Sequence, residues 1–176
     1  MEQKYIYSFS QIEDKVKALH ETNTEAAAAV ALSWLGLSRD ELKTLRVSDY
    51  NSTMRMLHSA GRVVYVREDL IADMLKAICE EAPEYSMGFF IADVNSAYEA
   101  AEKQELSPIS VLKMRYFYEK HSAKLSGEPE DRVFLKEILR SVGESEADME
   151  KQFAEYEKDA PEKYRPLLPH KYIVYM

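Results

Sequence analysis

Glycine is scarce in this chain, with five residues among 176. The sequence contains neither the P-loop pattern G-x-x-x-x-G-K-S/T nor G-x-G-x-x-G, so little backbone is suited to cradling phosphate. The H-E-x-x-H pattern of zinc proteases is absent as well. The four histidines, His20, His58, His121 and His170, lie far apart and share no ligand spacing with Cys79. We therefore expect no nucleotide site of these kinds, no metal site and no cofactor.

Cysteine occurs once, as Cys79 in a helix-like apolar run that also contains Leu75 and Ile78. An internal disulfide is excluded, and a buried thiol in a reducing compartment is the simplest expectation. No run approaches the ~18 to 20 apolar residues that span a bilayer. The first residues also lack the basic-then-apolar order of a signal peptide. The sequence predicts a soluble, cytoplasmic protein with no membrane partner.

Charge is unevenly distributed along the chain. The formal net charge is -8, and residues 127–162 hold 12 Asp and Glu against 5 Lys and Arg. Phosphate contacts need clustered cations, so this balance disfavours a surface that binds nucleic acid everywhere. Hydrophobic residues make up 46% of the chain, enough to close one core without metals or disulfides. We expect a single domain over residues 1–176.

Two helix-start patterns open the chain. Ser8 or Ser10 can cap a first helix that runs to about residue 20. Thr22 and Glu25 form the S/T-x-x-E pattern of a second start, directly before the run AAAAVALSWL. Because this run is apolar nearly all round, it predicts a central, buried helix with Trp34 in the core.

The next stretch, GLSRDELKTLRVSDY at residues 36–50, is the most informative one. Ser38 and Glu41 match a helix capping box, and Leu42 and Leu45 follow at helical spacing. A helix beginning at Arg39 is therefore expected. The stretch also raises a functional question, because it has the form of a catalytic motif from which one residue is missing.

Strands and further helices follow this stretch. Residues 54–57 and 62–66 are typical of two strands in a hairpin, since the β-branched pair Val63 and Val64 favours the second strand. Ser107 and Pro108 form a helix start with proline at the first position, and Gly143 is a helix stop. Helices are expected at 67–81, 93–103, 108–125, 132–142 and 147–158. The predicted fold class is mainly α with a small antiparallel β-sheet (α+β).

The order of these elements resembles the catalytic domain of tyrosine recombinases, the phage integrase family. The likeness begins at YSFSQIEDKVKAL, continues through G-L-x-x-x-E-L-x-x-L-x-x-x-D-Y, and covers about residues 5–158, leaving a tail at 159–176. The matching positions in the central stretch are Gly36, Leu37, Glu41, Leu42, Leu45 and Asp49. The resemblance implies a recombinase-like fold, with duplex DNA as the partner.

The catalytic residues that the resemblance implies are replaced in this chain. Ser38 stands where the family keeps the arginine that grips the scissile phosphate, and Ile109 stands at the histidine of its H-x-x-R motif. Glu144 occupies a second histidine position, and Phe153 occupies that of the nucleophilic tyrosine. The hairpin also lacks the family's lysine. An inactive domain is therefore implied, with Tyr156, one helical turn further on, as a fallback nucleophile.

The resemblance also implies where partners would bind. Cations near the expected phosphate face would contact duplex DNA; they are Arg39, Lys43, Arg62, Lys113, Arg115, Lys120 and Lys124. In the family the C-terminal element is donated to a neighbouring subunit. The strand-like segment from Tyr172 to Tyr175 is therefore expected to join a second copy and to form a homo-oligomer.

Several functions remain open at this point. The first is an inactive recombinase-like domain kept for DNA binding or regulation in a phage or other mobile element. The second is a protein-interaction module that has lost DNA binding, which the acidic residues 127–162 favour, although such a segment is also typical of a solvated face. The third is an active strand-transfer enzyme that uses Tyr156. With a different fold, residues 38–49 would belong to a small helix-turn-helix.

Overall fold

The computed structural model describes residues 9–81 and 88–163. Within these ranges the chain forms eight α-helices, one 3-10 turn and a three-stranded antiparallel sheet. This confirms the fold class that the sequence predicts, in its coarse form of a mainly helical chain with a small sheet. None of the helices in the described ranges is long and apolar enough to cross a membrane.

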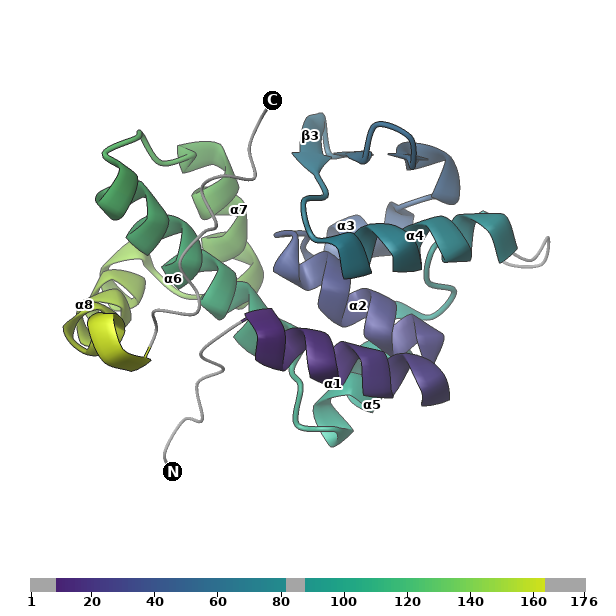
Figure 1. Cartoon of the computed structure of the whole chain (residues 1–176), viewed down its shortest axis with the longest axis horizontal. Helices are drawn as coiled ribbons and strands as arrows, with labels where there is room; N and C mark the ends of the chain where they lie inside the picture. The colour runs from purple at the N-terminus through teal and green to yellow at the C-terminus, as the bar shows by residue number, and fades with distance from the viewer. Residues whose placement is uncertain (1–8, 82–87, 164–176) are drawn as a thin grey trace.

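Helix α2, Thr24–Trp34, lies at the centre of the N-terminal part of the molecule (Figure 1). Its most extensive packing is against three helices: α1, Phe9–Thr22; α5, Val94–Lys103; and α6, Pro108–Ser126. Every α2 residue from Ala26 to Trp34 is buried. The small alanine side chains let neighbouring helices approach on all sides, as the apolar pattern predicts.

The predicted cap of α2 is wrong by one residue. Thr22 remains in the last turn of α1, where its hydroxyl donates to the carbonyl oxygen of Leu19 at 3.2 Å. Asn23 has the extended backbone that a cap needs, and its side chain accepts from the amide of Ala26 at 3.0 Å. The two helices are joined by this single residue, so only Asn23 is free to leave the helical conformation.

A short helix and the sheet follow α2. Helix α3 spans Arg39–Thr44, and the 3-10 turn η1 spans Val47–Asp49. The sheet order is β1-β2-β3, with strands at Tyr50–Asn51, Met56–Ser59 and Arg62–Tyr65. Strand β1 was not expected, and β2 begins two residues later than predicted. A turn with Arg55 at a φ of 53° occupies residues 52–55 and delays the strand.

The remaining helices are α4, Asp69–Glu81; α5 and α6; α7, Arg132–Val142; and α8, Glu146–Lys163. They lie where the sequence predicts them, except that α4 begins two residues later than expected and α8 continues five residues beyond the expected end at residue 158. Ser107 caps α6 ahead of Pro108, and Gly143 ends α7 with a φ of 72°. Figure 1 shows α6 leading from the α1–α5 group to α7 and α8. The strand-like segment predicted at Tyr172–Tyr175 lies outside the described residues.

Candidate functional site

The capping box at the start of α3 is present, and it belongs to a larger buried network. The hydroxyl of Ser38 accepts from the amide of Glu41 at 3.1 Å, and a Glu41 carboxylate oxygen accepts from the amide of Ser38 at 3.1 Å. Ser59 at the end of β2 donates its hydroxyl to the other oxygen of Glu41 at 2.7 Å. Both Ser38 and Glu41 are buried. Ser38 is therefore fixed as a helix cap and faces away from solvent.

Arg62 completes this network from β3. Its guanidinium donates to both Glu41 oxygens, at 2.7 and 3.0 Å, and to the carbonyl oxygen of Gly36 at 3.0 Å. Burial by itself raises the pKa of Glu41, but hydrogen bonds from Ser59 and Arg62 outweigh it and leave the pKa below its ordinary value. The carboxylate stays charged, and it neutralises Arg62.

The loop before α3 packs against Phe134 of α7. Gly36 has a φ of +91°, and the ring of Phe134 lies directly against it. A Cβ atom at position 36 would stand 2.1 Å from Cε2 of Phe134. Arg62 lies above the same ring, with its guanidinium carbon 5.9 Å from the ring centre. Glycine is thus required here by close packing as well as by the backbone conformation.

Lys113 and Glu144 form an ion pair between α6 and the loop that joins α7 to α8. The side chain of Lys113 is 15% exposed, so the pair is largely shielded from water. Gln152 on α8 donates to the second oxygen of Glu144. Ile109, one turn earlier on α6, packs against the hydrophobic core. Glu144 stands at the position where the resemblance implies a second histidine. It binds Lys113 there through an ion pair.

Arg115 points to a different side of α6. Its guanidinium lies over the rings of Trp34 and Tyr118 and donates to Glu119 at 2.7 Å. A second carboxylate, that of Glu68, lies 3.6 Å away and also accepts from the indole of Trp34 at 3.0 Å. Burial lowers the pKa of Arg115, but Glu119 and Glu68 raise it overall. This arginine therefore joins α6 to Trp34 of α2 and to Glu68, the residue before α4.

Lys120 lies two turns after Lys113 on α6. It contacts Glu130, before α7, and Glu150, on α8, each at 2.9 Å. Burial raises the pKa of Glu150, but hydrogen bonds from Lys120 and Tyr116 lower it overall. The Tyr116 hydroxyl donates to Glu150 at 2.8 Å. Lys120 is therefore held by carboxylates of the acidic C-terminal segment.

Three further cations lie nearer to solvent. Lys124, which is 62% exposed, pairs with Glu157 on α8. Arg39 donates to the side-chain oxygen of Asn95 at 2.7 Å and lies over the ring of Tyr98. Lys43 is exposed on α3 and forms no ion pair with the described residues.

The expected nucleophile position and its fallback both lie in the core of the C-terminal helices. Phe153 has no hydroxyl, and its ring centre lies 6.3 Å from that of Phe117. Tyr156 stacks on Phe117 with ring centres 5.3 Å apart, and its side chain is 2% exposed. A buried ring cannot bring its oxygen to the phosphorus of a duplex without leaving this core.

The structure thus brings the predicted residues together only in part. Ser38 and Arg62 meet through Glu41, whereas Lys113, Arg115 and Lys120 each have acidic partners of their own. The carboxylates that hold these cations were not predicted individually. The signal that could have indicated them is the excess of Asp and Glu over residues 127–162, which supplies Glu130, Glu144, Glu150 and Glu157.

Comparisons with protein-family models, with curated proteins and with solved structures give no match for this chain. The resemblance to tyrosine recombinases therefore stays a prediction from the sequence. Within the part of the chain that the structure describes, no group of three or more His, Cys, Asp or Glu is placed to hold a metal ion.

Proposed function

We propose that this chain is a catalytically inactive, tyrosine-recombinase-like domain that acts by binding protein rather than by holding or cleaving DNA. One observation carries the proposal. Five of the cations expected to contact phosphate already pair with carboxylates of the same chain; they are Arg62, Lys113, Arg115, Lys120 and Lys124.

The geometry around the implied catalytic positions supports the loss of activity. A phosphate clamp needs permanently charged groups that are free to donate to the phosphate oxygens. Ser38 is instead committed to the cap of α3, and Glu144 brings a negative charge next to Lys113. A phosphate at either position would have to displace a carboxylate that already pairs with the nearby cation, Glu41 on Arg62 or Glu144 on Lys113.

Catalysis is tested with a nicked duplex that traps a covalent protein–DNA adduct. We expect no adduct with the wild-type chain, because Phe153 lacks a hydroxyl and Tyr156 is buried. The Tyr156→Phe variant is the matched control. An adduct that forms with the wild type and is lost in this variant would overturn the inactive assignment.

Binding to DNA is tested with a pool of random duplexes from low to physiological salt. Phosphate contacts give a log-log slope of about -0.9 for each phosphate neutralised. We expect no binding even at low salt, because five of the seven expected cations keep their internal carboxylate partners. Binding with a steep salt slope that becomes shallower in Lys113→Ala and Lys120→Ala would instead support a DNA-binding domain.

A second candidate function is DNA binding that is masked by the acidic segment. It is favoured by the arrangement of Lys113, Lys120 and Lys124, which all pair with carboxylates of the loops around α7 or of α8. The triple variant Glu144→Gln, Glu150→Gln, Glu157→Gln removes three of these charges and keeps the side-chain shapes. Salt-dependent DNA binding by this variant alone would identify masking.

The open edge of the sheet supports the protein-binding role. Strand β3 lies at one edge, and no described strand pairs with its outer side. Val63 and Tyr65 on this strand are 42% and 58% exposed. An open strand edge with apolar side chains is a template for an added strand. We expect the Tyr172–Tyr175 segment of a second copy as one occupant, which would make the protein a homo-oligomer.

Sedimentation of the full-length chain over a range of concentrations tests this oligomer. The variant Ile173→Asp should be monomeric if the terminal segment carries the contact. Val133→Asp is the control, because Val133 is 66% exposed on α7, far along the chain from the segment. A monomeric wild type, or equal dissociation of both variants, would exclude this oligomer.

A further inference from the structure

The hydrogen-bond ladder of the β2–β3 hairpin decides which backbone groups of β3 face its free edge. Ser59 and Arg62 flank a two-residue turn and lie opposite each other, so they are the hydrogen-bonded pair that closes the hairpin. Hydrogen-bonded and non-hydrogen-bonded pairs then alternate along the ladder. The amide of Val66 donates to the carbonyl oxygen of Arg55 at 2.9 Å, as this alternation requires. The even-numbered residues of β3 therefore turn their backbone groups toward β2.

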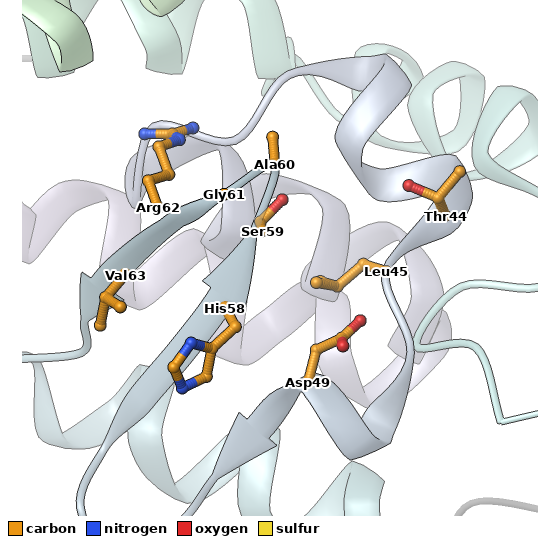
Figure 2. A pocket seen from close by; sticks show the side chains of 9 residues that line it. All are labelled: Thr44, Leu45, Asp49, His58, Ser59, Ala60, Gly61, Arg62 and Val63. Carbon is orange, nitrogen blue, oxygen red and sulfur yellow. The ribbon is translucent and has the colours of Figure 1, made fainter.

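The odd-numbered residues of β3, Val63 and Tyr65, turn their N–H and C=O groups to the free edge, where no described strand pairs with them. Their side chains are 42% and 58% exposed. Val63 lies opposite His58 in the ladder, so both face outward, whereas Arg62 turns to the inner face. Figure 2 shows this hairpin beside an open hollow of about 410 Å³, which Asp49 lines from the opposite wall. The free edge is separate from that hollow.

This edge restricts the kind of strand that can be added to it. Antiparallel pairing lets Val63 and Tyr65 each exchange both hydrogen bonds with one opposite residue. Those two opposite residues are two positions apart, and their side chains join the outer face. The residue between them lies opposite Val64, which packs against the core from the inner face. The edge therefore fits an extended segment that alternates between side chains suited to water and side chains suited to a core.

The segment KYIVYM, residues 171–176, has this alternation. One antiparallel register sets Tyr175 opposite Val63 and Ile173 opposite Tyr65. Each outer pair then joins an aromatic side chain to a β-branched one, which is a favourable cross-strand combination. The triplet Ile-Val-Tyr also has the same pattern as the Val-Val-Tyr triplet of β3 itself.

Lys171 distinguishes this register from a shifted one. In the register given above, Val174 lies opposite Val64, and Lys171 falls on the outer face in water. A slip by one residue exchanges the two faces of the added strand. The slip that sets Val174 against Val63 brings Lys171 opposite Val66, which is 2% exposed. It would bury a charged side chain without a partner, so it is disfavoured.

We infer that residues 171–176 of a second copy pair antiparallel with β3 in this register and extend the three-stranded sheet by one strand. The inference rests on the proposed protein-binding function, and it adds the register and the side-chain pattern that select the occupant. A second copy supplies the segment, because α8 ends at Lys163 on the side of the molecule away from β3 (Figure 1). Pro166 and Pro169, in the intervening residues, favour an extended linker over one that folds back.

Amide hydrogen exchange of the full-length chain over a range of concentrations tests the pairing. The amides of Val63 and Tyr65 should exchange about tenfold more slowly at high concentration than at low, because they gain acceptors in the second copy. The amide of Val64 faces β2 at every concentration and is the internal control. Ile173→Asp should abolish the added protection. Val133→Asp, an exposed site on α7, should keep it.

The register is measured by contacts between isotope-labelled and unlabelled chains mixed in equal amounts. We expect the α-hydrogens of Val64 and Val174 to meet across the two chains, as in a non-hydrogen-bonded antiparallel pair. A contact from Val64 to Ile173 would mean a shifted register. A contact from Val64 to Val64 of the partner subunit would mean that two β3 edges pair with each other. Either result would overturn the inference.

Two further results would overturn it. Protection of Val63 and Tyr65 that does not depend on concentration would assign the segment to the same chain. A dimer seen by sedimentation in which these two amides stay unprotected would keep the proposed oligomer and refute this contact. Salt-dependent DNA binding by the wild type, in contrast, would defeat the proposed protein-binding function whatever the exchange experiment gives.

Discussion

A carboxylate oxygen of Glu41 lies 2.7 Å from Nη2 of Arg62, and this ion pair joins α3 to β3 in a largely buried position. The side chains of Glu41 and Arg62 are 4% and 15% exposed. A buried pair gains little over apolar packing, but loss of one partner leaves a charge without solvent or counterion. The pair therefore makes the register between the helix and the hairpin sensitive to single substitutions.

A double-mutant cycle tests this relationship. Glu41→Gln and Arg62→Gln should each lower the free energy of unfolding by about 3 kcal/mol, the lower end for a broken buried pair. The double variant should lose less than the sum, with a coupling of roughly 0.5 to 3 kcal/mol. Urea denaturation measures all four proteins. Additive losses would mean that the two side chains act independently.

The capping box gives a second prediction. Ser38→Ala removes the acceptor for the amide of Glu41 and should cost about 0.5 to 2 kcal/mol. Ser48→Ala is the control, since Ser48 is an exposed serine in η1. It should change the unfolding free energy by less than about 0.5 kcal/mol. If the urea midpoint of Ser38→Ala equals that of the wild type, the cap does not stabilise α3.

These two features differ in how far the sequence could predict them. The cap at Ser38 depends on a residue three positions away, so a local pattern predicts it. The partners of Arg62 and Lys113 lie 21 and 31 positions away, and no local pattern fixes which carboxylate they meet. Their identity depends on how the hairpin and α8 pack, which is a property of the tertiary fold.

Competition between neighbouring caps explains the error at α2. Thr22 and Asn23 are both good cap residues, and the S/T-x-x-E pattern favours Thr22. The choice depends on where α1 ends, and helix ends are the least certain part of a sequence-based prediction. The edge position of β3 and the hollow beside Asp49 could not be predicted from the sequence either, because both result from the order of strands in the sheet.

Close packing at Gly36 gives a third prediction. Gly36→Ala forces a Cβ atom into the ring of Phe134 and a positive φ on an alanine, and should cost about 2 to 4 kcal/mol. Gly143→Ala is the matched control, because it has a φ of +72° with no atom within 4 Å of the added carbon. It should cost only about 1 kcal/mol. Equal losses in thermal unfolding would show that Phe134 moves aside freely.

The hairpin turn offers a stabilising substitution. Ala60 and Gly61 have φ values of 50° and 76°, the positive pair of a type I′ turn. Alanine is strained in this conformation, whereas asparagine tolerates it and is the preferred residue before glycine. Ala60→Asn should raise the free energy of unfolding by about 0.5 to 1 kcal/mol. A lower midpoint in urea would mean that the alanine is not strained.

Acid sensitivity should arise in part from His121 on α6. The imidazole is buried, and its ring meets the edge of Tyr156 with the centres 5.5 Å apart. Burial lowers the pKa of His121 below the ordinary value of 6.5, and the positive charge of Lys124 lowers it further. The folded chain therefore keeps this imidazole neutral at a pH where the unfolded chain protonates it.

The sign of the pH effect follows from this difference. As pH falls through about 6.5, the unfolded state takes up a proton that the folded state does not, so the folded state loses stability. The loss continues down to the lowered pKa and then stops for this group. Below about 4.5, protonation of Glu41 and Glu150 adds a separate loss, because their pKa values are lowered by their hydrogen bonds.

His121→Phe isolates the histidine contribution, since a phenyl ring fills much of the same volume without a titrating group. Its free energy of unfolding should change less than that of the wild type between pH 7.5 and 5.5. The control is His58→Gln, which replaces an exposed histidine on β2 and keeps His121. Urea unfolding at pH 7.5 and 5.5 measures the free energy of unfolding of all three proteins. If the wild type and His121→Phe lose stability equally over this interval, a group other than His121 carries the pH dependence.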